Sequence, residues 1–310
     1  MPDRILRLRH RDILRALDGF DLLDVVAQEL IRRAGGGERS RAGADAGVAV
    51  STAMTSVGEA GTGPVCLLPT PSLRMVGLAA LATLAIRELC PAAAVTAAVF
   101  GAGPAARLHL SLIARYLPHV AHASVHPSGV ELDRSVERRM RGELARAGTT
   151  LSVHAGPPPA ALGANLLVVT EPGWGRLDLG RLRPGTVIVN ATRRDLPDEV
   201  LIEVHRLYVD DLGLLEHNQH RAFVRLHQEV PDGGPGPDGR RAASWRHERR
   251  IDTDLGQVLI GAHGGTDADE VVLVELLEGG SLDVRLAGRV HRAVLALGLD
   301  AVARGPGAEG

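Results

Sequence analysis

The chain has 310 residues, which is enough for two domains of ordinary size. Its formal charge of −2 gives no electrostatic basis for binding nucleic acid or an anionic membrane, so neither is expected as a partner. Hydrophobic residues make up 45% of the chain and aromatic residues only 2%. A core built from Ala, Leu and Val favours the close helix–sheet packing of α/β proteins over an aromatic ligand groove.

The cysteines and the N-terminus indicate a cytoplasmic protein. Cys66 and Cys90 lie far apart in the sequence, and neither has a second Cys at metal-ligand spacing. A disulfide framework is therefore not expected, and a reducing compartment is. The first residues are charged and lack the apolar run of a signal peptide. The apolar segment 75–86 ends at Arg87 and Glu88, is too short to span a bilayer, and is expected to be a buried helix.

The N-terminal part of the chain mixes helical and strand patterns. Residues 5–34 carry an apolar stripe at helical spacing and end at consecutive glycines, which predicts a helical segment. Short strands are expected over Gly47–Met54 and Val65–Leu68, separated by a turn-rich stretch. Residues 72–89 predict a long helix, which Pro91 ends.

After this helix the pattern changes to alternating strands and helices. Short, almost continuous apolar runs predict strands that are buried on both faces of a parallel sheet. The expected strands are Val95–Phe100, Val120–Val125, Leu151–His154, Leu166–Thr170, Thr186–Asn190, Leu207–Val209 and Val271–Leu276. The expected helices are Ala105–Tyr116, Leu132–Arg146, Asp252–Gly261 and Leu282–Leu297, and residues 231–250 are expected to form an exposed loop.

The first of these strands leads into a glycine-rich turn, Gly101-Ala102-Gly103-Pro104-Ala105-Ala106. Gly101 permits a tight turn, and Gly103 lets the backbone approach a pyrophosphate. Ala106 is small enough for the following helix to pack closely on the strand. The N-terminus of that helix presents free N–H groups to phosphates, and Pro104 is tolerated there because its missing N–H costs nothing. Between a strand and a helix, this motif predicts a bound dinucleotide.

These patterns predict an α/β fold with a Rossmann-type doubly wound parallel sheet and a second, smaller α+β substrate/dimerisation domain. Residues 93–283 are expected to form the NAD(P)-binding Rossmann domain. Residues 1–92 and 284–310 are expected to form the substrate/dimerisation domain.

The end of the second expected strand bears on the choice of cofactor. A carboxylate usually stands there to hold the ribose diol, but this chain has His126-Pro127-Ser128 instead. His126 and Ser128 are therefore candidate cofactor contacts, and NADPH is slightly favoured over NADH. The alternative, that Glu131 or Asp133 supplies the carboxylate and His126 is an exposed loop residue, is left open.

Several further stretches occur in a fixed order along the chain. They are Arg74–Ala79, Gly101–Arg107, Gly163–Thr170, Leu182–Ala191, Asp195–Pro197, Val209–Asp211 and Leu255–Val258. As an ordered set they resemble the ornithine cyclodeaminase and mu-crystallin family over residues ~70–300. The Val-Asp-Asp and Leu-Gly-Gln-Val stretches look most like the branch of amino-acid-conjugate dehydrogenases that serves siderophore biosynthesis.

The resemblance implies a homodimer that uses NAD(P) on a small, amino-acid-like molecule. Asp195 falls where the family has its catalytic Asp-x-Pro. Arg74 is the only member of the family's carboxylate-binding set that carries over, because the corresponding region Gly47–Gly63 contains neither Lys nor Arg. The resemblance therefore supports the fold and the cofactor more strongly than it supports a substrate.

The positions of the candidate catalytic residues in the predicted elements allow both a functional and a structural interpretation of each. Asp195 follows the carboxyl end of a buried strand and could pass a proton to or from an imine nitrogen or a water; alternatively it caps the helix near Glu199. Arg74 could hold a carboxylate in bidentate fashion, or it could be a surface residue at a helix start. Thr170 and Asn190 end neighbouring strands and are expected beside the nicotinamide, although strand-end polar residues are common without a ligand.

A polar run, Glu216–Arg221, places His217 and His220 one helical turn apart. Two histidines at this spacing make only half of a metal site, and the sequence offers no obvious third ligand. A polar helix near the mouth of the cleft is therefore favoured over a metal site. A contact between His217 or His220 and the substrate stays open.

The function expected from these observations is an NAD(P)-dependent oxidoreductase that acts on a C–N bond of an amino acid or imine, in specialised natural-product biosynthesis. Asp195 would move the proton, and Arg74 would hold the substrate carboxylate. Two alternatives stay open. One is an ornithine cyclodeaminase-type enzyme that uses NAD internally and releases ammonia. The other, implied by the mu-crystallin resemblance, is a non-catalytic NAD(P)H-binding protein.

Overall fold

The computed structural model describes residues 5–36, 47–58, 64–90, 96–127, 132–154, 163–172, 182–229, 251–263, 266–277 and 280–298. The chain divides into two compact units. One consists of Met1–Leu81 with Glu278–Gly310, and the other of Ala82–Leu277. The division falls inside the long helix α3 (Thr70–Leu89), whereas the sequence predicts it just after this helix. No helix among the described residues combines the length and the apolar character that crossing a membrane requires.

The second unit is built on a sheet of eight strands whose pairings are all parallel. The strands are β5 (Thr96–Phe100), β6 (His122–His126), β7 (Thr150–Val153), β8 (Leu166–Val169), β9 (Val187–Asn190), β10 (Arg206–Val209), β11 (Thr253–Asp254) and β12 (Val272–Glu275). The helices are α4 (Pro104–Tyr116), α5 (Arg134–Arg146), α6 (Asp198–Glu203), η4 (Leu212–Asn218), α7 (Ala222–Glu229) and α8 (Leu255–Leu259).

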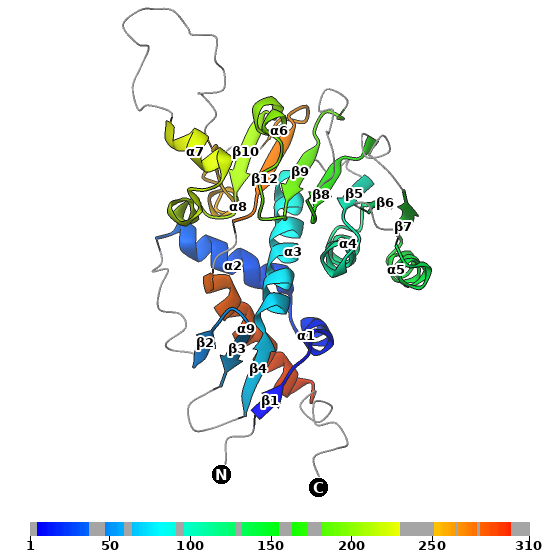
Figure 1. The fold of residues 1–310 in the computed structure, drawn as a ribbon, viewed down its shortest axis with the longest axis vertical. Helices are drawn as coiled ribbons and strands as arrows, with labels where there is room; N and C mark the ends of the chain where they lie inside the picture. Colours follow the sequence, from blue (N-terminus) through cyan, green and yellow to red (C-terminus); the bar gives the residue numbers. More distant parts are fainter. Residues whose placement is uncertain are drawn as a thin grey trace, which may run out of the picture. The chain divides into compact units, whose positions relative to one another are not determined.

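The strand order of this sheet is β11-β10-β12-β9-β8-β5-β6-β7 (Figure 1). From β5 the chain moves outward through β6 to β7, then returns to β8 on the other side of β5 and moves outward again to β9. The strand order therefore reverses between β5 and β8. In open α/β sheets, ligands bind outside the carboxyl ends of the strands at such a reversal. The predicted doubly wound sheet is confirmed, and its reversal places a candidate site after Phe100 and Val169.

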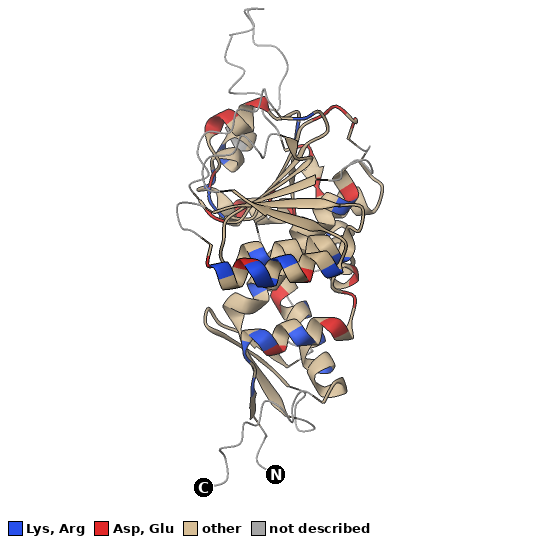
Figure 2. Cartoon of the chain, turned by 90° about the vertical axis from the view of Figure 1, so that its right-hand side faces the viewer, with Lys and Arg blue, Asp and Glu red and all other residues tan. Residues whose placement is uncertain are grey.

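The core of this unit follows the alternation of side chains along the strands. One face of the sheet packs against α6 and α7 in a single apolar cluster. Its members include Ala98, Phe100, Leu167, Val169, Ile188, Val209 and Leu273 from the sheet, and Val200, Leu201, Phe223 and Val224 from the two helices. In Figure 1, α4 and α5 lie on the other side of the sheet. Figure 2 shows that charged residues lie on helices and loops, whereas the strands of the large sheet are almost entirely uncharged. This is the pattern of strands buried on both faces.

The described part of the first unit combines a small mixed sheet with helices. The sheet has the order β1-β4-β3-β2, with β1 parallel to β4 and the other pairs antiparallel. Its strands are β1 (Ile5–Arg7), β2 (Val48–Val50), β3 (Met54–Val57) and β4 (Val65–Pro69). Its helical segments are α1 (His10–Ala16) with η1 (Leu17–Gly19), α2 (Leu22–Ala34), the start of α3, and α9 (Gly280–Ala296). The predicted smaller α+β domain is confirmed.

Three local predictions are corrected. Residues 5–7 form a strand that pairs with Val65–Leu67, a long-range pairing that a three-residue stretch does not reveal by its periodicity. The expected strand Gly47–Met54 is instead two strands, β2 and β3, paired as a hairpin. The expected helix Asp252–Gly261 begins with the short strand β11, and only Leu255–Leu259 is helical. The predicted loop at 231–250 lies outside the described residues.

A buried carboxylate joins α2 to α9 in the first unit. The Glu29 side chain is 0% exposed and accepts hydrogen bonds from Arg32, Arg33, Ser281 and Arg285 at 2.7–3.0 Å. Burial by itself raises the pKa of Glu29, but the hydrogen bonds from Arg32, Ser281 and Arg33 outweigh it and lower the pKa to about 2. Glu29 is therefore ionised in the folded protein at every pH above about 2.

This network leads to a prediction about stability. Glu29→Gln should lower the free energy of unfolding by about 3 kcal/mol at pH 7, because the folded state loses a buried, paired carboxylate but keeps the arginines that surround it. Since the pKa is lowered from 4.5 to about 2, the stabilisation is complete above about pH 5 and is lost as the pH falls through about 2.

Chemical denaturation followed by circular dichroism at pH 7 and at pH 3 measures this effect. The control is Glu88→Gln, which removes a carboxylate from an exposed pair with Arg87. The control should change the free energy by about 0.5 kcal/mol or less. Equal effects of the two variants would show that the Glu29 network contributes no more than a surface pair.

Candidate functional site

The glycine-rich turn lies at the reversal point of the large sheet. It connects β5 to α4, and Pro104 is the first residue of that helix. Gly101 has φ +129°, a conformation that favours glycine, and a Cβ there would lie 2.3 Å from Thr170 Oγ1. Ala106 is 0% exposed at the start of α4. The local geometry thus matches the reasons for which the sequence predicts a phosphate-binding turn.

The turn also has a direct partner that shows what its N–H groups bind. The main-chain N–H groups of Ala102 and Gly103 donate to Glu171 Oε1, at 3.1 and 2.9 Å. Glu171 follows the end of β8, the strand beside β5 in the sheet. A carboxylate oxygen thus occupies the position where these N–H groups would meet a phosphate oxygen. Two convergent N–H groups at a helix start are the donor set that an anion requires, so the turn fits a dinucleotide pyrophosphate.

His126, the last residue of the second strand β6, is buried and uncharged. The His126 ring is 3% exposed and lies stacked against Phe100 and His154, with ring centroids 5.2 Å apart in each pair. Its Nε2 lies 3.0 Å from Ser124 Oγ. Burial, with a smaller contribution from His154, lowers the pKa of His126 to about 4, so the ring is neutral at pH 7. His126 is therefore a buried strand residue and not the exposed loop residue that the alternative expectation describes.

Asp133 and Glu131 are the two carboxylates that could replace the acid that usually holds the ribose diol. Asp133 is the N-cap of α5 and accepts from the main-chain N–H groups of Ser135 and Val136. Its Oδ1 therefore caps the start of the helix, and a contact between Asp133 and the ribose stays a prediction. Ser128 and Glu131 lie outside the described residues.

The two polar residues expected beside the nicotinamide differ in their surroundings. Thr170 is half-buried next to the turn, and its hydroxyl donates to the carbonyl of Phe100 at 2.8 Å. Asn190 is 0% exposed. Its Nδ2 donates to Arg194 O and Glu275 Oε2, and its Oδ1 accepts twice from Thr192. The polar atoms of the Asn190 side chain thus hold the loop after β9. Its expected place beside the nicotinamide stays a prediction.

Asp195 lies on that loop and is held by α7. Its Oδ1 accepts from Arg221 Nε at 2.9 Å and from the main-chain N–H of Ala222 at 3.0 Å. The side chain is 36% exposed. Asp195 thus caps the start of α7, not the helix near Glu199, and no hydrogen bond from the described residues reaches its other oxygen, Oδ2. This leaves one carboxylate oxygen available for proton exchange.

Arg221 joins Asp195 to a second, fully buried carboxylate. Its guanidinium is almost buried, and its second nitrogen donates to Glu275 Oε2 at 2.6 Å. Asn190 donates to the same oxygen at 2.8 Å, whereas Glu275 Oε1 is buried and accepts no hydrogen bond from the part of the chain that the structure describes. Burial raises the pKa of Glu275 to about 7, against the opposing charge of Arg221 and the two hydrogen bonds. The strand ends of β9 and β12 therefore share a charged network behind Asp195.

The sequence does not single out Glu171, Arg221 or Glu275 for these roles. Glu275 had a detectable signal, because it is a charged residue at the end of an otherwise apolar strand. Arg221 belongs to the polar run Glu216–Arg221, in which the histidines drew attention instead. Glu171 directly follows Thr170, but only the return of β8 beside β5 brings it to the glycine-rich turn.

The first unit contains the other predicted catalytic residue. Arg74 lies in the first turns of α3 and is half-buried, and its Nε donates to Asp283 Oδ2 of α9 at 3.2 Å. Arg74 is thus more than a surface residue at a helix start, because its guanidinium is held by the carboxylate of Asp283. A substrate carboxylate would have to bind to Arg74 in the presence of Asp283.

The two histidines of the polar run are both exposed, His217 at the end of η4 and His220 just after it. Within the part of the chain that the structure describes, no group of three His, Cys, Asp or Glu residues could hold a metal ion. Their contact with a substrate stays a prediction.

The acidic residues of the Val-Asp-Asp stretch have structural roles. Asp210 Oδ1 accepts from the main-chain N–H of Leu277, and Asp211 caps η4 through Gly213. Asp254, just before the Leu-Gly-Gln-Val stretch, caps α8 and accepts from the main-chain N–H of Leu212. Asp210 and Asp254 therefore link the segments at the ends of β10, β11 and β12.

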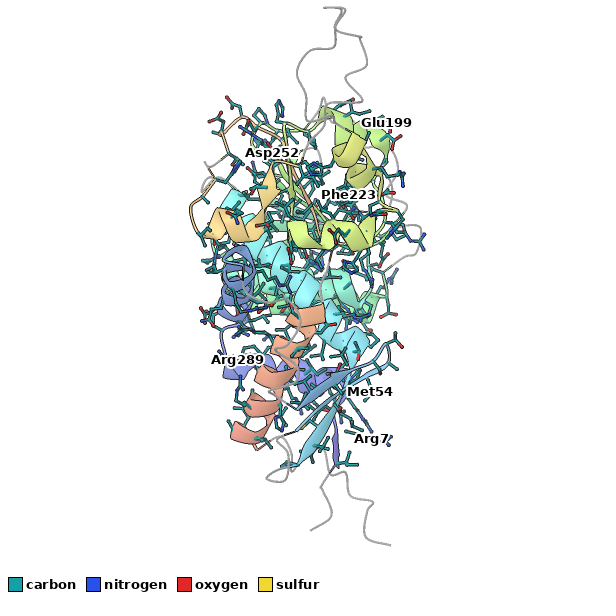
Figure 3. All side chains as sticks on the ribbon, turned by 90° about the vertical axis from the view of Figure 1, so that its left-hand side faces the viewer. Arg7, Met54, Glu199, Phe223, Asp252 and Arg289 are labelled. Carbon is teal, nitrogen blue, oxygen red and sulfur yellow. The ribbon has the colours of Figure 1, made fainter. Side chains whose placement is uncertain are left out.

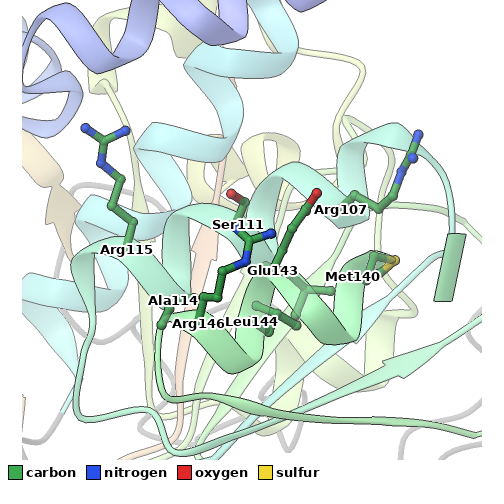
Figure 4. Close-up of a pocket in the computed structure, with 10 residues that line it drawn as sticks. Arg107, Ser111, Ala114, Arg115, Met140, Glu143, Leu144 and Arg146 are labelled. Carbon is green, nitrogen blue, oxygen red and sulfur yellow. The ribbon is translucent and has the colours of Figure 1, made fainter. Parts of the chain in front are cut away.

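A separate cavity of about 360 Å³ lies between α4 and α5 (Figure 4). Its floor is apolar, with Leu110, Ala114, Met140 and Leu144 among the lining residues, and it also involves Arg107, Arg115, Glu143 and Arg146. It is lined by side chains of these two helices and the residue after α5, and not by strand ends. It is therefore distinct from the turn at Gly101–Gly103.

Comparison with known proteins adds the following. No protein-family model matches the chain. A protein of Rhizobium meliloti strain 1021 whose name proposes a dehydrogenase is 29% identical over 227 residues, which cover 71% of this chain and 63% of that relative. The chain thus matches less than two thirds of this relative's length.

Solved structures match the chain over almost its whole length. A protein called CmnK has a TM-score of 0.71 at 23% identity, with 96% of this chain and 97% of CmnK covered. The Δ1-pyrroline-2-carboxylate reductase of Thermococcus litoralis, solved with NADH and L-proline, has a TM-score of 0.64 at 15% identity, with 94% and 98% covered. A Bordetella pertussis Tohama I protein proposed to be an ornithine cyclodeaminase has a TM-score of 0.66 at 16% identity, with 96% and 98% covered. The resemblance predicted from the motifs is confirmed for the fold: the chain has the fold of the ornithine cyclodeaminase-like proteins.

Proposed function

We propose that this chain is an NAD(P)-dependent oxidoreductase that acts on a carbon–nitrogen bond of an amino acid or an imine. The observation that carries the proposal is the turn between β5 and α4, where the N–H groups of Ala102 and Gly103 converge on an anionic oxygen at the reversal point of the sheet. Among the solved structures with this fold, the Thermococcus reductase was solved with NADH and an amino acid. An archaeal alanine dehydrogenase with the same fold was solved with bound NAD.

The residues of the turn would hold the dinucleotide. Ala102 and Gly103 would donate to the pyrophosphate, Gly101 would allow the close approach of the backbone, and the N-terminus of α4 would supply its partial positive charge. When bound, the nicotinamide supplies or accepts the hydride of the reaction. NADPH remains slightly favoured. At the end of β6 the neutral His126 stands where a ribose-binding carboxylate usually lies, and it places no negative charge against a 2′-phosphate.

Asp195 is the group we assign to proton transfer. Its Oδ1 is fixed by Arg221 and by the start of α7, which sets the orientation of the carboxylate while Oδ2 exchanges a proton with the substrate nitrogen or a water. None of the 310 residues is a lysine, so neither a lysine general base nor a lysine carboxylate anchor operates in this chain. Arg74 is the remaining candidate for the carboxylate anchor.

The test is a set of reactions with purified protein and reduced cofactor. Cyclic imino acids, and 2-oxo acids mixed with ammonia or an amine, are the substrates to offer. Consumption of NAD(P)H with formation of the amine product supports the proposal. An ornithine cyclodeaminase-type reaction would instead release ammonia from a diamino acid with no net change in reduced-nicotinamide absorbance. That result would replace the proposed function by this alternative.

A second candidate is a dinucleotide-binding protein without turnover. The observation that favours it is that Arg74, the one expected carboxylate anchor, is paired with Asp283 in a chain without lysine. Saturable dinucleotide binding, with no turnover of any imine or amino acid in the substrate panel, is the result that selects it.

We also propose that the chain forms a homodimer through the small sheet of the first unit. The alanines of α3, Ala79, Ala80, Ala82 and Ala85, are 0% exposed and offer no free surface for this contact. One face of the sheet carries the apolar residues Ile5, Val65, Leu67 and Met54 together with Arg7 and Ser56, and Ile5 is 60% and Met54 37% exposed. Figure 3 shows Arg7 and Met54 on the side of this sheet away from α9.

A second copy of the chain is the occupant proposed for this face, because an exposed apolar surface is a liability in a monomer. Met54→Asp should convert a dimer to a monomer in sedimentation at micromolar concentration. The control is Ile260→Asp, at an exposed apolar residue of the other unit, 47% exposed, which should leave the dimer intact. A wild-type protein that sediments as a monomer, or a Met54→Asp variant that stays dimeric, contradicts the assignment.

A further inference from the structure

Glu171 places a negative charge in the very position that the proposed dinucleotide needs. Its Oε1 accepts hydrogen bonds from the main-chain N–H groups of Ala102 and Gly103 at 3.1 and 2.9 Å. These are the donors assigned above to the pyrophosphate. Hydrogen bonds to a charged carboxylate are about twice as strong as hydrogen bonds between neutral groups, so Glu171 binds these two N–H groups firmly.

The Glu171 side chain also fills the space next to the turn. An added Cβ on Gly103 would lie 2.9 Å from Glu171 Oε1, and one on Gly101 would lie 3.1 Å from Glu171 Cδ and Cγ. The carboxylate therefore lies against the backbone of both glycines. A phosphate oxygen cannot occupy the same donors at the same time, and two anions so close would repel each other.

We propose that Glu171 is a displaceable internal occupant of the phosphate-binding turn, which competes with the dinucleotide and thereby lowers the affinity of the chain for it. The inference rests on the proposed function, since it assumes that the turn binds a dinucleotide phosphate. Cofactor binding then requires the carboxylate to leave the two N–H groups. A glutamate side chain can do so by rotating about its own bonds, without a change in the strands that carry the turn.

The contact has a consequence for the protein without cofactor. With Glu171 in place, the N–H groups of Ala102 and Gly103 have a partner, so the turn keeps its closed shape before a ligand arrives. Removing the carboxylate leaves these donors to water, which should make them exchange their hydrogens faster. The loop thus has two states, one closed by Glu171 and one closed by the dinucleotide, and a ligand shifts the population only by the difference in affinity between them.

Two variants separate the charge of Glu171 from its side chain. Glu171→Gln keeps the size and one acceptor oxygen but removes the charge, and Glu171→Ala removes the occupant. Both should bind NADH and NADPH more tightly than the wild type, with Glu171→Ala about tenfold or more tighter and Glu171→Gln in between. The matched control is Glu203→Gln, an exposed carboxylate on α6 of the same unit, which should leave the affinity unchanged.

Affinity is measured by isothermal titration, and amide hydrogen exchange of the segment around residues 100–107 is measured in the absence of dinucleotide. Tighter binding together with faster exchange in Glu171→Ala is the expected result. Unchanged or weaker binding of the variants, where the wild type does bind, overturns the competition and leaves the proposed function standing. Binding by neither wild type nor variants overturns both. Unchanged exchange in Glu171→Ala shows that the carboxylate does not hold the turn, and this also overturns the inference.

Discussion

Gly103→Asp should abolish dinucleotide binding, with an affinity lowered by about a hundredfold or more. The new carboxylate would lie beside the N–H groups that donate to the pyrophosphate. Two like charges this close repel each other, and the repulsion costs several kcal/mol of binding free energy. The backbone at Gly103 has φ −73° and ψ −173°, an extended conformation that any residue adopts. The nearest atom to a new Cβ is the flexible end of Glu171, so the variant should still fold.

Isothermal titration with NADH and NADPH measures the loss, and circular dichroism confirms that the variant is folded. The control is Gly142→Asp on α5, where a Cβ meets nothing within 4 Å and the same charge is added away from the turn. The control should bind as the wild type does. A folded Gly103→Asp variant that binds as tightly as the control would show that the pyrophosphate does not lie on this turn.

Asp195→Asn should lose most of the turnover, on the order of 10²–10⁴-fold, if Asp195 is the proton-transfer group. The amide keeps an oxygen for Arg221 Nε and the N–H of Ala222, so the loop and the start of α7 should stay in place. It cannot exchange a proton as a carboxylate does. Dinucleotide affinity should be almost unchanged, because the phosphate-binding turn follows a different strand.

Steady-state kinetics with a verified substrate, dinucleotide titration and thermal unfolding together distinguish the possible roles of Asp195. Lost turnover with retained binding and folding supports proton transfer. A large loss of stability relative to the exposed control Asp198→Asn shows that Asp195 is chiefly a helix cap. Unchanged turnover contradicts the assignment and moves attention to His217 and His220.

The sheet and its phosphate-binding turn could be predicted because their signals are local. Strands buried on both faces are continuous apolar runs, and a strand-turn-helix with glycines at fixed places needs few residues to identify. The strand at Ile5–Arg7 could not be predicted, because its only reason to exist is a partner strand near Val65, about sixty residues away. Three residues next to a helical pattern carry no periodicity of their own.

The candidate site was predicted only in part for the same reason. Asp195 and Arg74 could be located by motif, but their partners Arg221 and Asp283 lie far away in the sequence. Asn190 ends a strand as expected, but the sequence does not reveal that its four hydrogen bonds support the loop after β9. Glu171 reaches the turn only because β8 returns beside β5. Each of these facts depends on tertiary pairing, which a residue's place in the sequence does not reveal.

Titration of the unmodified protein with NADPH and with NADH, followed by the fluorescence of the reduced nicotinamide, tests the central claim most directly. The account predicts saturable binding at one site per chain, with NADPH bound at least as tightly as NADH, and with the signal removed by Gly103→Asp. A folded protein that binds neither cofactor would contradict it.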